Sequence, residues 1–271
     1  MHSLAENSIQ QVLEVIDALL GPEGCPWDRE QTPSSLCDYF LEESFELTEA
    51  VQSGQRQEIL EEMGDVFFLL FFLARLFQKE QGLELQQIWE QSAGKMRSRH
   101  PHVFSKMHIA SRQELHDNWE QRKMQEKEAK NQDTSWQSLF DSLPQGLPPL
   151  LKSYRIHSKA ARAGFTWSSD QEQEQALQQE WQEWKQAAEQ GQMQAKQEEF
   201  GDLLFTLVET GRRHGVKANT ALRQANQKFL QRWELMQALA EEKGLSWEEL
   251  DMHAREELWQ EAKSRQDWPD R

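Results

Sequence analysis

Pairs of acidic residues three positions apart recur along this sequence of 271 residues. Glu43 and Glu46 form one pair, and Glu62 and Asp65 form the next. On a helix, residues three apart share a face, with their Cβ atoms roughly 5–6 Å apart. Four carboxylates gathered on two neighbouring helices repel one another, and a divalent cation relieves this repulsion. The pattern therefore predicts a metal site made of oxygen ligands, the kind that suits Mg²⁺ or Mn²⁺.

The same quartet occurs again 137 residues further along the chain. Glu180, Glu183, Glu199 and Asp202 repeat the internal spacing of the first set. The flanking residues repeat as well, since EEMGDVFF around Glu62 becomes EEFGDLLF in the second half. Two copies with one spacing favour a functional role over a chance pair on a solvated helix face. They also predict that the chain contains two copies of one helical unit.

Basic side chains follow each quartet. Lys95 and Arg99 stand four apart in the first half, and Lys228 and Arg232 repeat this spacing in the second. A carboxylate-bound cation near such charges is suited to a triphosphate, which the metal positions for attack by water. For Lys95 and Arg99, the alternative is a basic helix C-terminus that is favourable to the helix dipole.

Helical periodicity extends over almost the whole chain, and no stretch alternates convincingly as a strand. Because the linkers are short, we expect the two helices of each quartet to pack antiparallel. Ser34 is a predicted N-cap, and Ser246 with Glu249 is a predicted capping box for the last helix. The predicted helices cover residues 9–20, 34–53, 56–81, 85–99, 111–131, 150–163, 170–190, 192–214, 218–243 and 246–265.

The predicted organisation is all-α, with two repeats and a connector. The first repeat covers residues 1–110 and the second covers 149–271. Residues 111–148 are predicted to be a very polar, solvent-facing helix followed by a linker rich in proline. The apolar run 66–77 is predicted to be core or a dimer seam.

Composition excludes several classes of protein. Acidic residues outnumber basic ones 46 to 30, and the net charge of -16 argues against a broad surface for nucleic acid. The longest apolar stretch, 66–74, is too short to span a membrane. Two cysteines twelve residues apart support neither a disulfide framework nor a thiolate metal site, so a cytoplasmic protein is expected.

Burial and aromatic residues give further expectations. Asp65 and Asp202 border apolar runs, so we expect them to be partly buried. Trp27 and Trp167 lie in matching loops, Gly-Cys-Pro-Trp and Gly-Phe-Thr-Trp. Each tryptophan either stacks on a base or anchors its loop, and the buried anchor is the favoured interpretation.

These motifs together resemble those of MazG nucleoside triphosphate pyrophosphohydrolases. The resemblance rests on Leu41-Glu42-Glu43-x-x-Glu46, on Glu62-Met63-Gly64-Asp65, on the loop at 24–28 and on Arg99-His100-Pro101-His102-Val103-Phe104. It implies an all-α homodimer that uses Mg²⁺ to cleave nucleoside triphosphates to the monophosphate and pyrophosphate. In that family the two acidic motifs hold the metal.

The resemblance also implies roles in the second repeat, which often carries the activity in two-repeat relatives. Lys228 and Arg232 resemble the pair that contacts phosphate, and Trp259 resembles the residue that meets the base. The second repeat departs from the pattern at Gln179, where a glutamate is expected, and at Ala176, where a basic residue is expected. Lys196 is the predicted substitute for that basic residue.

Two rival functions remain open at this stage. A di-iron carboxylate oxidoreductase also uses a helical bundle, but it requires Glu-x-x-His motifs, and this chain has Glu-x-x-Glu and Glu-x-x-Asp. A catalytically degenerate nucleotide-binding or scaffold protein is the second rival, and Gln179 and Ala176 are the residues that favour it.

Overall fold

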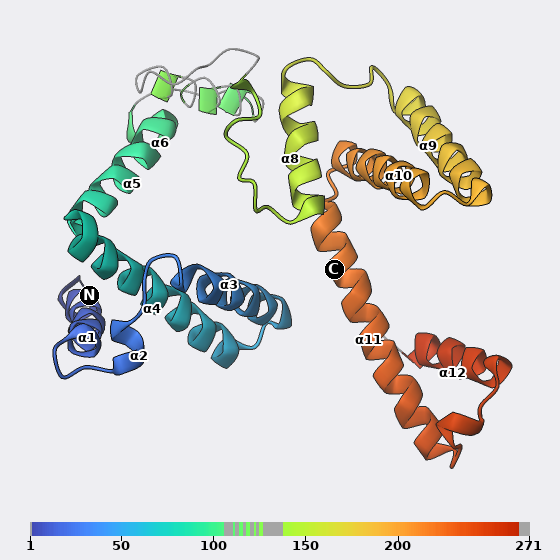
Figure 1. Ribbon diagram of the computed structural model, residues 1–271, viewed down its shortest axis with the longest axis horizontal. Coiled ribbons are helices and arrows are strands. Elements are labelled where there is room, and N and C mark those ends of the chain that lie inside the picture. The colour runs from blue at the N-terminus through green and yellow to red at the C-terminus, as the bar shows by residue number, and fades with distance from the viewer. Residues whose placement is uncertain are drawn as a thin grey trace. The chain divides into compact units, whose positions relative to one another are not determined.

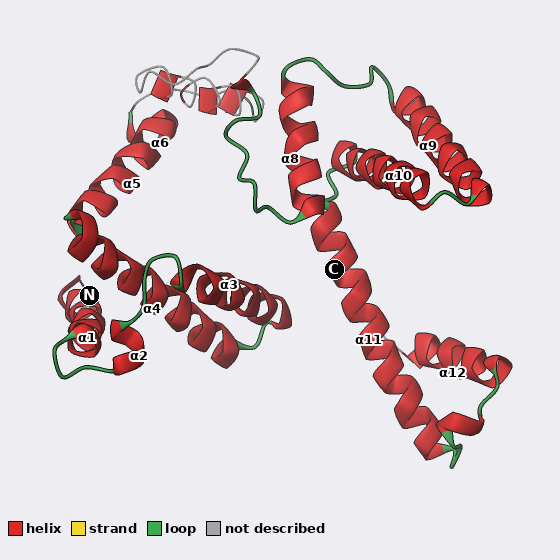
Figure 2. Ribbon diagram, viewed as in Figure 1, coloured by secondary structure: helices red, strands yellow, loops and turns green. Residues whose placement is uncertain are grey.

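The structure, a computed structural model, describes residues 2–105 and 138–265, with side chains from residue 8 onward. Between these ranges it describes residues 111, 114–115, 118–119, 122 and 125–126. All regular elements in the described residues are helices (Figures 1 and 2), which confirms the all-α class. The chain divides into two compact units, Met1–Lys130 and Asn131–Arg271. This division falls inside the predicted connector.

The first unit is organised around a helical hairpin. Helices α3 and α4 pack side by side (Figure 1), joined only by Gly54 and Gln55. Gly54 ends α3 with a left-handed φ of 72°, which a glycine adopts without steric cost and which makes so short a turn possible. The helices of this unit are α1 (His2–Leu20), α2 (Pro26–Arg29), α3 (Leu36–Ser53), α4 (Arg56–Gln81), α5 (Leu85–Arg99) and α6 (Pro101–Phe104).

The core of the first unit lies where α1 packs against the second half of α4 and the start of α3. Leu36 and Phe72 are each 1% exposed there, and Ile16 is fully buried. Leu13, Phe71 and Leu76 complete the cluster. This apolar core fixes the end of the α3–α4 hairpin that lies away from its connecting turn.

The second unit repeats the hairpin. Helices α9 and α10 pack side by side with only Gly191 and Gln192 between them, and α8 packs against α10. Helix α11 leads away from this layer, and α12 folds back on its far half (Figure 1). The elements are α8 (Pro149–Arg162), α9 (Asp170–Gln190), α10 (Met193–Arg213), α11 (Ala218–Glu242), the 3-10 turn η2 (Trp247–Glu249) and α12 (Met252–Arg265).

Two predicted N-caps are wrong. The last helix begins at Met252 rather than after Ser246, because the Asp251 carboxylate accepts a hydrogen bond from the Ala254 N–H at 2.8 Å. The residues after Ser246 form only the single turn η2. Near the start of α3, the flanking residue is Ser35 rather than Ser34, and its hydroxyl hydrogen-bonds within the preceding turn.

The polar segment 111–131 lies mostly outside the described residues. Those that are described contradict a purely solvent-facing arm, because Trp119 and Glu126 are half-buried against the end of α5. In the described part of the chain, no helix combines the length and apolar character needed to cross a bilayer.

Candidate functional site

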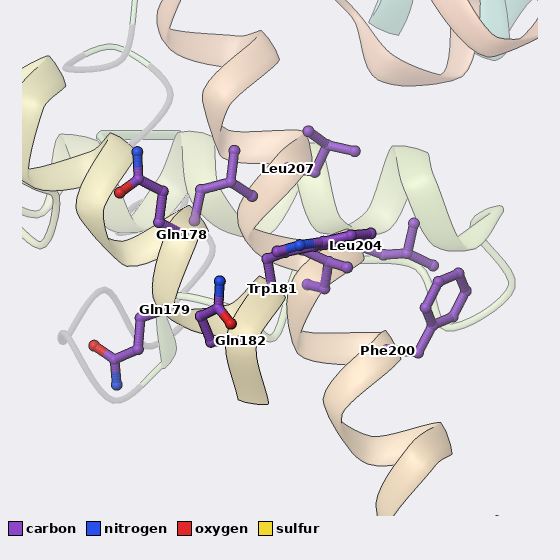
Figure 3. Close-up of a pocket in the computed structure, with 9 residues that line it drawn as sticks. Gln178, Gln179, Trp181, Gln182, Phe200, Leu204 and Leu207 are labelled. Carbon is purple, nitrogen blue, oxygen red and sulfur yellow. The ribbon is translucent and has the colours of Figure 1, made fainter. Parts of the chain in front are cut away.

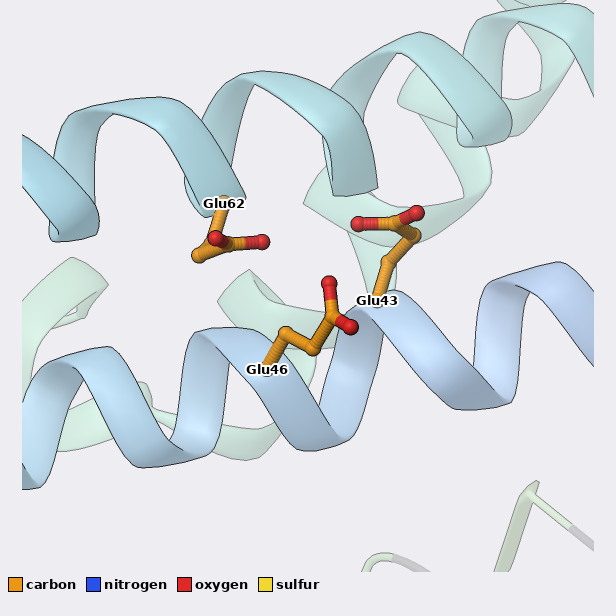
Figure 4. A group of neighbouring side chains, drawn as sticks. All are labelled: Glu43, Glu46 and Glu62. Carbon is orange, nitrogen blue, oxygen red and sulfur yellow. The ribbon is translucent and has the colours of Figure 1, made fainter.

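The first acidic quartet converges across the α3–α4 hairpin. Figure 4 shows Glu62 projecting from α4 toward Glu43 and Glu46 on α3. Carboxylate oxygens of these three residues all lie within 4.8 Å of one another. Asp65 lies one turn beyond Glu62 and is outside this group of three, although its charge still acts on Glu43. The predicted convergence of two helices is therefore confirmed for three of the four residues.

The second quartet converges in the same way on the α9–α10 hairpin. Glu180, Glu199 and Asp202 have carboxylate oxygens within 4.8 Å of one another. The fourth member, Glu183, instead accepts a hydrogen bond from Gln179 Nε2 at 2.9 Å. Gln179 stands where the first repeat has Glu42. Its amide hydrogen-bonds to Glu183, a carboxylate outside the group of three, so this substitution has a direct structural consequence.

Burial and like charges together act on the pKa values of these carboxylates. The pKa of Glu43 is raised by partial burial and by the charges of Glu46, Asp65 and Glu62. The pKa of Glu180 is raised by partial burial and by the charges of its three partners. Unlike charges would lower both values, so the hairpins hold like charges together with insufficient compensation.

The expected burial of the two aspartates is wrong. Asp65 and Asp202 are exposed, whereas Glu43, Glu62 and Glu180 are half-buried. Leu203, which directly follows Asp202, is buried, but other apolar residues near the aspartates are exposed in the single chain, among them Phe67 on α4 at 50%.

Exposed apolar residues of the second hairpin line a groove. Figure 3 shows Trp181 lying between the α9 and α10 helices, with Leu204 and Phe200 beside it. The groove has a volume of about 790 Å³. Its other lining residues are Leu177, Gln178, Gln179, Gln182, Leu203 and Leu207. An apolar surface of this kind is typical of a protein interface.

The predicted substrate residues of the second repeat fall into two places. Lys196 is half-buried on α10, one turn before Glu199 and on the same side of that helix. Lys228, Arg232 and Trp259 lie on α11 and α12, with the Arg232 guanidinium 5.5 Å from the centre of the Trp259 ring. Helix α11 leads away from the α9–α10 layer (Figure 1), and α12 packs against α11. Of the described residues, Glu183, Asp202 and Glu199 are those whose charges act on the pKa of Glu180, and no basic group is among them.

The first repeat contains a matching arginine and tryptophan. The Arg99 guanidinium lies 5.2 Å from the centre of the Trp119 ring and is hydrogen-bonded to the Glu126 carboxylate, with its Nε at 3.1 Å. Sequence analysis missed Trp119, although it precedes Trp259 by 140 residues, the same offset that relates the loops at Trp27 and Trp167. Lys95 is exposed near the end of α5.

The two loop tryptophans differ. Trp27 is 51% exposed and makes an edge contact with Tyr39, so the favoured buried anchor is wrong for this residue. Trp167 is half-buried and lines a pocket between α8, α9 and α10. Glu209 and His157, which also line that pocket, were missed. The sequence feature that could have indicated Glu209 is an acidic residue at the end of the mainly apolar run Leu-Leu-Phe-Thr-Leu-Val.

We predict that Glu180→Gln raises the melting temperature of metal-free protein at pH 7 by roughly 1–2 °C, because it removes one repelling charge. Because the pKa of Glu180 is raised in the folded state, protonation of this carboxyl favours folding. The ionised carboxylate therefore destabilises the fold at neutral pH, and this destabilisation is relieved as pH falls through that pKa. The rise in melting temperature caused by Glu180→Gln should therefore be smaller at pH 5 than at pH 7. Thermal unfolding in EDTA measures it, with exposed Glu189→Gln on the same helix as the control. A lower melting temperature for Glu180→Gln than for this control would show that the charges do not repel.

Comparisons with known proteins identify relatives of this chain. A sequence model of the MazG nucleotide pyrophosphohydrolase domain matches residues 31–104, which include the first hairpin. A solved structure, the mazG-related protein from Thermotoga maritima, is 28% identical, with a TM-score of 0.38. It covers 42% of this chain and 97% of its own.

Two curated relatives match nearly the full length. The nucleoside triphosphate pyrophosphohydrolase of Escherichia coli strain K12 is 34% identical over 260 residues, 95% of this chain and 97% of the relative. The nucleoside triphosphate pyrophosphohydrolase/pyrophosphatase MazG of Thermotoga maritima is 33% identical over 254 residues, 94% and 95% of the two chains. With two converging acidic quartets and this similarity along almost its whole length, the chain belongs to the MazG family of nucleoside triphosphate pyrophosphohydrolases.

Proposed function

We propose that this chain is a Mg²⁺-dependent enzyme that cleaves nucleoside or deoxynucleoside triphosphates to the nucleoside monophosphate and pyrophosphate. The observation that carries the proposal is the group of three carboxylates within 4.8 Å on each of two helical hairpins. The names of the Escherichia coli and Thermotoga maritima relatives support the same hydrolytic activity.

The donor set fits Mg²⁺, with Mn²⁺ as the closest substitute. Both groups of three offer only carboxylate oxygens, which are the ligands that hard divalent cations prefer. Their mixture of half-buried and exposed side chains leaves room for water and phosphate oxygens as further ligands. When bound, the cation would offset charge on the phosphates and favour ionisation of a water molecule. The same donor set lacks the histidines that the di-iron chemistry requires.

The second repeat is the better candidate for catalysis. Glu180, Glu199 and Asp202 would hold the cation, and Lys196, one turn from Glu199, would offset phosphate charge. In the first repeat, Ile59 stands at the position that corresponds to Lys196. Glu43, Glu46 and Glu62 would still bind a cation there, with Asp65 beside them.

We propose that the enzyme works as a homodimer. Lys228, Arg232 and Trp259 lie on α11 and α12, a helical pair that leads away from the α9–α10 hairpin, so in the proposed dimer they would reach a substrate bound at the carboxylates of a second copy. The apolar groove around Trp181 and Leu204 supports this arrangement, because contact with a second copy would bury it.

Replacement of Glu199 tests the catalytic proposal. We expect Glu199→Gln to lower pyrophosphate release from a panel of triphosphates by about 100-fold or more, as loss of a transition-state charge partner typically does. The helical circular dichroism spectrum should be unchanged. Chromatography of the products should show monophosphate in the wild type rather than diphosphate.

The matched control for this experiment is Glu62→Gln, the same change in the first repeat. Full activity of Glu199→Gln together with loss in Glu62→Gln would assign catalysis to the first repeat. Absence of hydrolysis in the wild type would favour the degenerate, nucleotide-binding alternative.

The dimer is tested by placing a charge in the groove. We expect Trp181→Glu to shift the mass measured by light scattering from about twice 31.9 kDa toward 31.9 kDa, because a buried unpaired carboxylate opposes association. Gln186→Glu, an exposed position on another face of α9, is the control and should leave the mass unchanged. A wild-type protein that is monomeric at all concentrations would contradict the dimer.

A further inference from the structure

A second pocket lies on the α9–α10 hairpin, beyond the acidic group. It has a volume of about 630 Å³ and is lined by residues of α8, of the loop 164–168 and of α9 and α10. Phe165, Trp167 and Phe205 contribute aromatic surface. His157 and Glu209 contribute polar atoms, although both side chains are buried.

Glu209 is an ionised group held in the interior. It is 1% exposed, and both of its oxygens accept hydrogen bonds from Arg212, at 2.6 Å from Nε and 2.8 Å from Nη2. Burial opposes ionisation, but the Arg212 bonds outweigh it and hold the pKa of Glu209 below its usual range. A carboxylate has about four lone-pair sites, so Arg212 and the more distant Thr166 hydroxyl at 3.4 Å leave acceptor capacity.

His157 adds a second acceptor beside this carboxylate. Its Nε2 lies 3.0 Å from the Phe205 carbonyl oxygen, which can only accept, so Nε2 carries the proton. Burial lowers the pKa of His157, which favours the neutral ring. Nδ1 is then an acceptor, 3.6 Å from a Glu209 oxygen. Two neighbouring acceptors in one pocket match a ligand that presents two adjacent N–H donors.

The first repeat forms the same kind of hairpin with apolar residues at the positions of Glu209 and Gln173. At the offset of 137, Glu209 corresponds to Phe72, and the buried Gln173 corresponds to Leu36. Phe72 and Leu36 close the first hairpin with an apolar core. A protein with apolar groups in place of a buried ion pair of similar volume is often equally stable or more stable. Stability therefore does not account for the buried polar residues of the second repeat, whereas a role in binding does.

The spacing also connects this pocket to the acidic group. Glu209 follows Asp202 by seven residues, two helical turns or about 10.5 Å along the same face of α10. Glu180 follows Gln173 by the same seven residues on α9. This span is comparable to the distance that separates the phosphates of a nucleotide from its base.

We propose that the pocket around Glu209 and His157 receives the base of the substrate and selects bases with adjacent N–H donors, such as guanine, over uracil or thymine. The proposal rests on the proposed function, because it assumes that the phosphates lie at Glu180, Glu199 and Asp202. Trp167 supplies an aromatic face on which a base can pack. Base selection then belongs to the second repeat, whose hairpin has this pocket.

Binding of monophosphates to the full-length, metal-free protein tests the pocket without requiring catalysis. We expect calorimetry to show GMP binding about tenfold or more tightly than UMP, as a pair of specific base contacts provides. Glu209→Gln should reduce this ratio about tenfold, because the amide places a donor where an acceptor is needed. The control is Glu198→Gln, an exposed position on the same helix, which should keep the ratio.

A second variant covers the case in which Glu209→Gln fails to fold. Gln173→Leu with Glu209→Phe copies the residues of the first repeat, so we expect it to keep the fold and Mn²⁺ binding while losing binding of GMP. Thr166→Val, which removes only the hydroxyl near Glu209, should weaken GMP binding and leave UMP binding unchanged. Equal binding of GMP and UMP by the wild type, or a preference that survives the double variant, would overturn the proposal.

The outcomes separate this inference from the proposed function. A GMP preference in a protein that hydrolyses no triphosphate would support the pocket and reject the enzyme. Hydrolysis of all triphosphates at one rate, without any preference among monophosphates, would support the enzyme and reject the pocket. Trp259→Ala should weaken all bases alike, since an aromatic face does not read their hydrogen-bonding edges.

Discussion

Mutual repulsion among carboxylates held together on two helices is the constraint on which this molecule depends. The turns Gly54-Gln55 and Gly191-Gln192 are so short that the hairpin helices stay side by side, and their acidic residues remain in one place. Partial burial, together with this crowding of like charges, raises the pKa of Glu43 and of Glu180. In the proposed function, a divalent cation would supply the missing counter-charge, and it would let a protein with a net charge of -16 bind a polyanion.

The same hairpin is used twice with different surroundings. In the first repeat, Leu36 and Phe72 join an apolar core, and Arg99 is paired with Glu126. In the second repeat, buried Gln173 and Glu209 stand in the corresponding places, beside a pocket of about 630 Å³. Identical acidic spacing on both hairpins, with different interiors beside them, favours a division of labour in which the second repeat binds and converts the nucleotide.

Much of this organisation is predictable from spacing. The quartets, the short linkers and the offset of 137 predict two hairpins with converging carboxylates, and most helix bounds agree within a few residues. Caps are less predictable, because Ser246 and Asp251 both suit a helix start, and in the structure it is Asp251 that accepts the capping hydrogen bond. The exposure of Asp65 was also unpredictable, since only the second half of the neighbouring apolar run, including Phe71 and Phe72, packs into the core, whereas Phe67 is 50% exposed.

Residues that act through tertiary contacts were the hardest to find. Glu209 is an isolated acid in an apolar sequence, and only its contacts with Arg212 and His157 distinguish it from a surface residue. Gln179 was visible as a departure from the repeat, but its hydrogen bond to Glu183 was not. Internal comparison of the repeats is the signal that would have identified Glu209, because Phe72 holds the matching position.

Direct titration of metal-free protein with Mn²⁺, followed by the paramagnetic resonance of the free ion, tests the central claim most directly. The account predicts that the intact chain binds Mn²⁺, that Glu62→Gln or Glu199→Gln alone removes only part of this binding, and that the two changes together abolish it. Mn²⁺ binding that is absent from the wild type, or that is equal in the wild type and the double variant, would contradict the assignment of the carboxylate groups as metal sites.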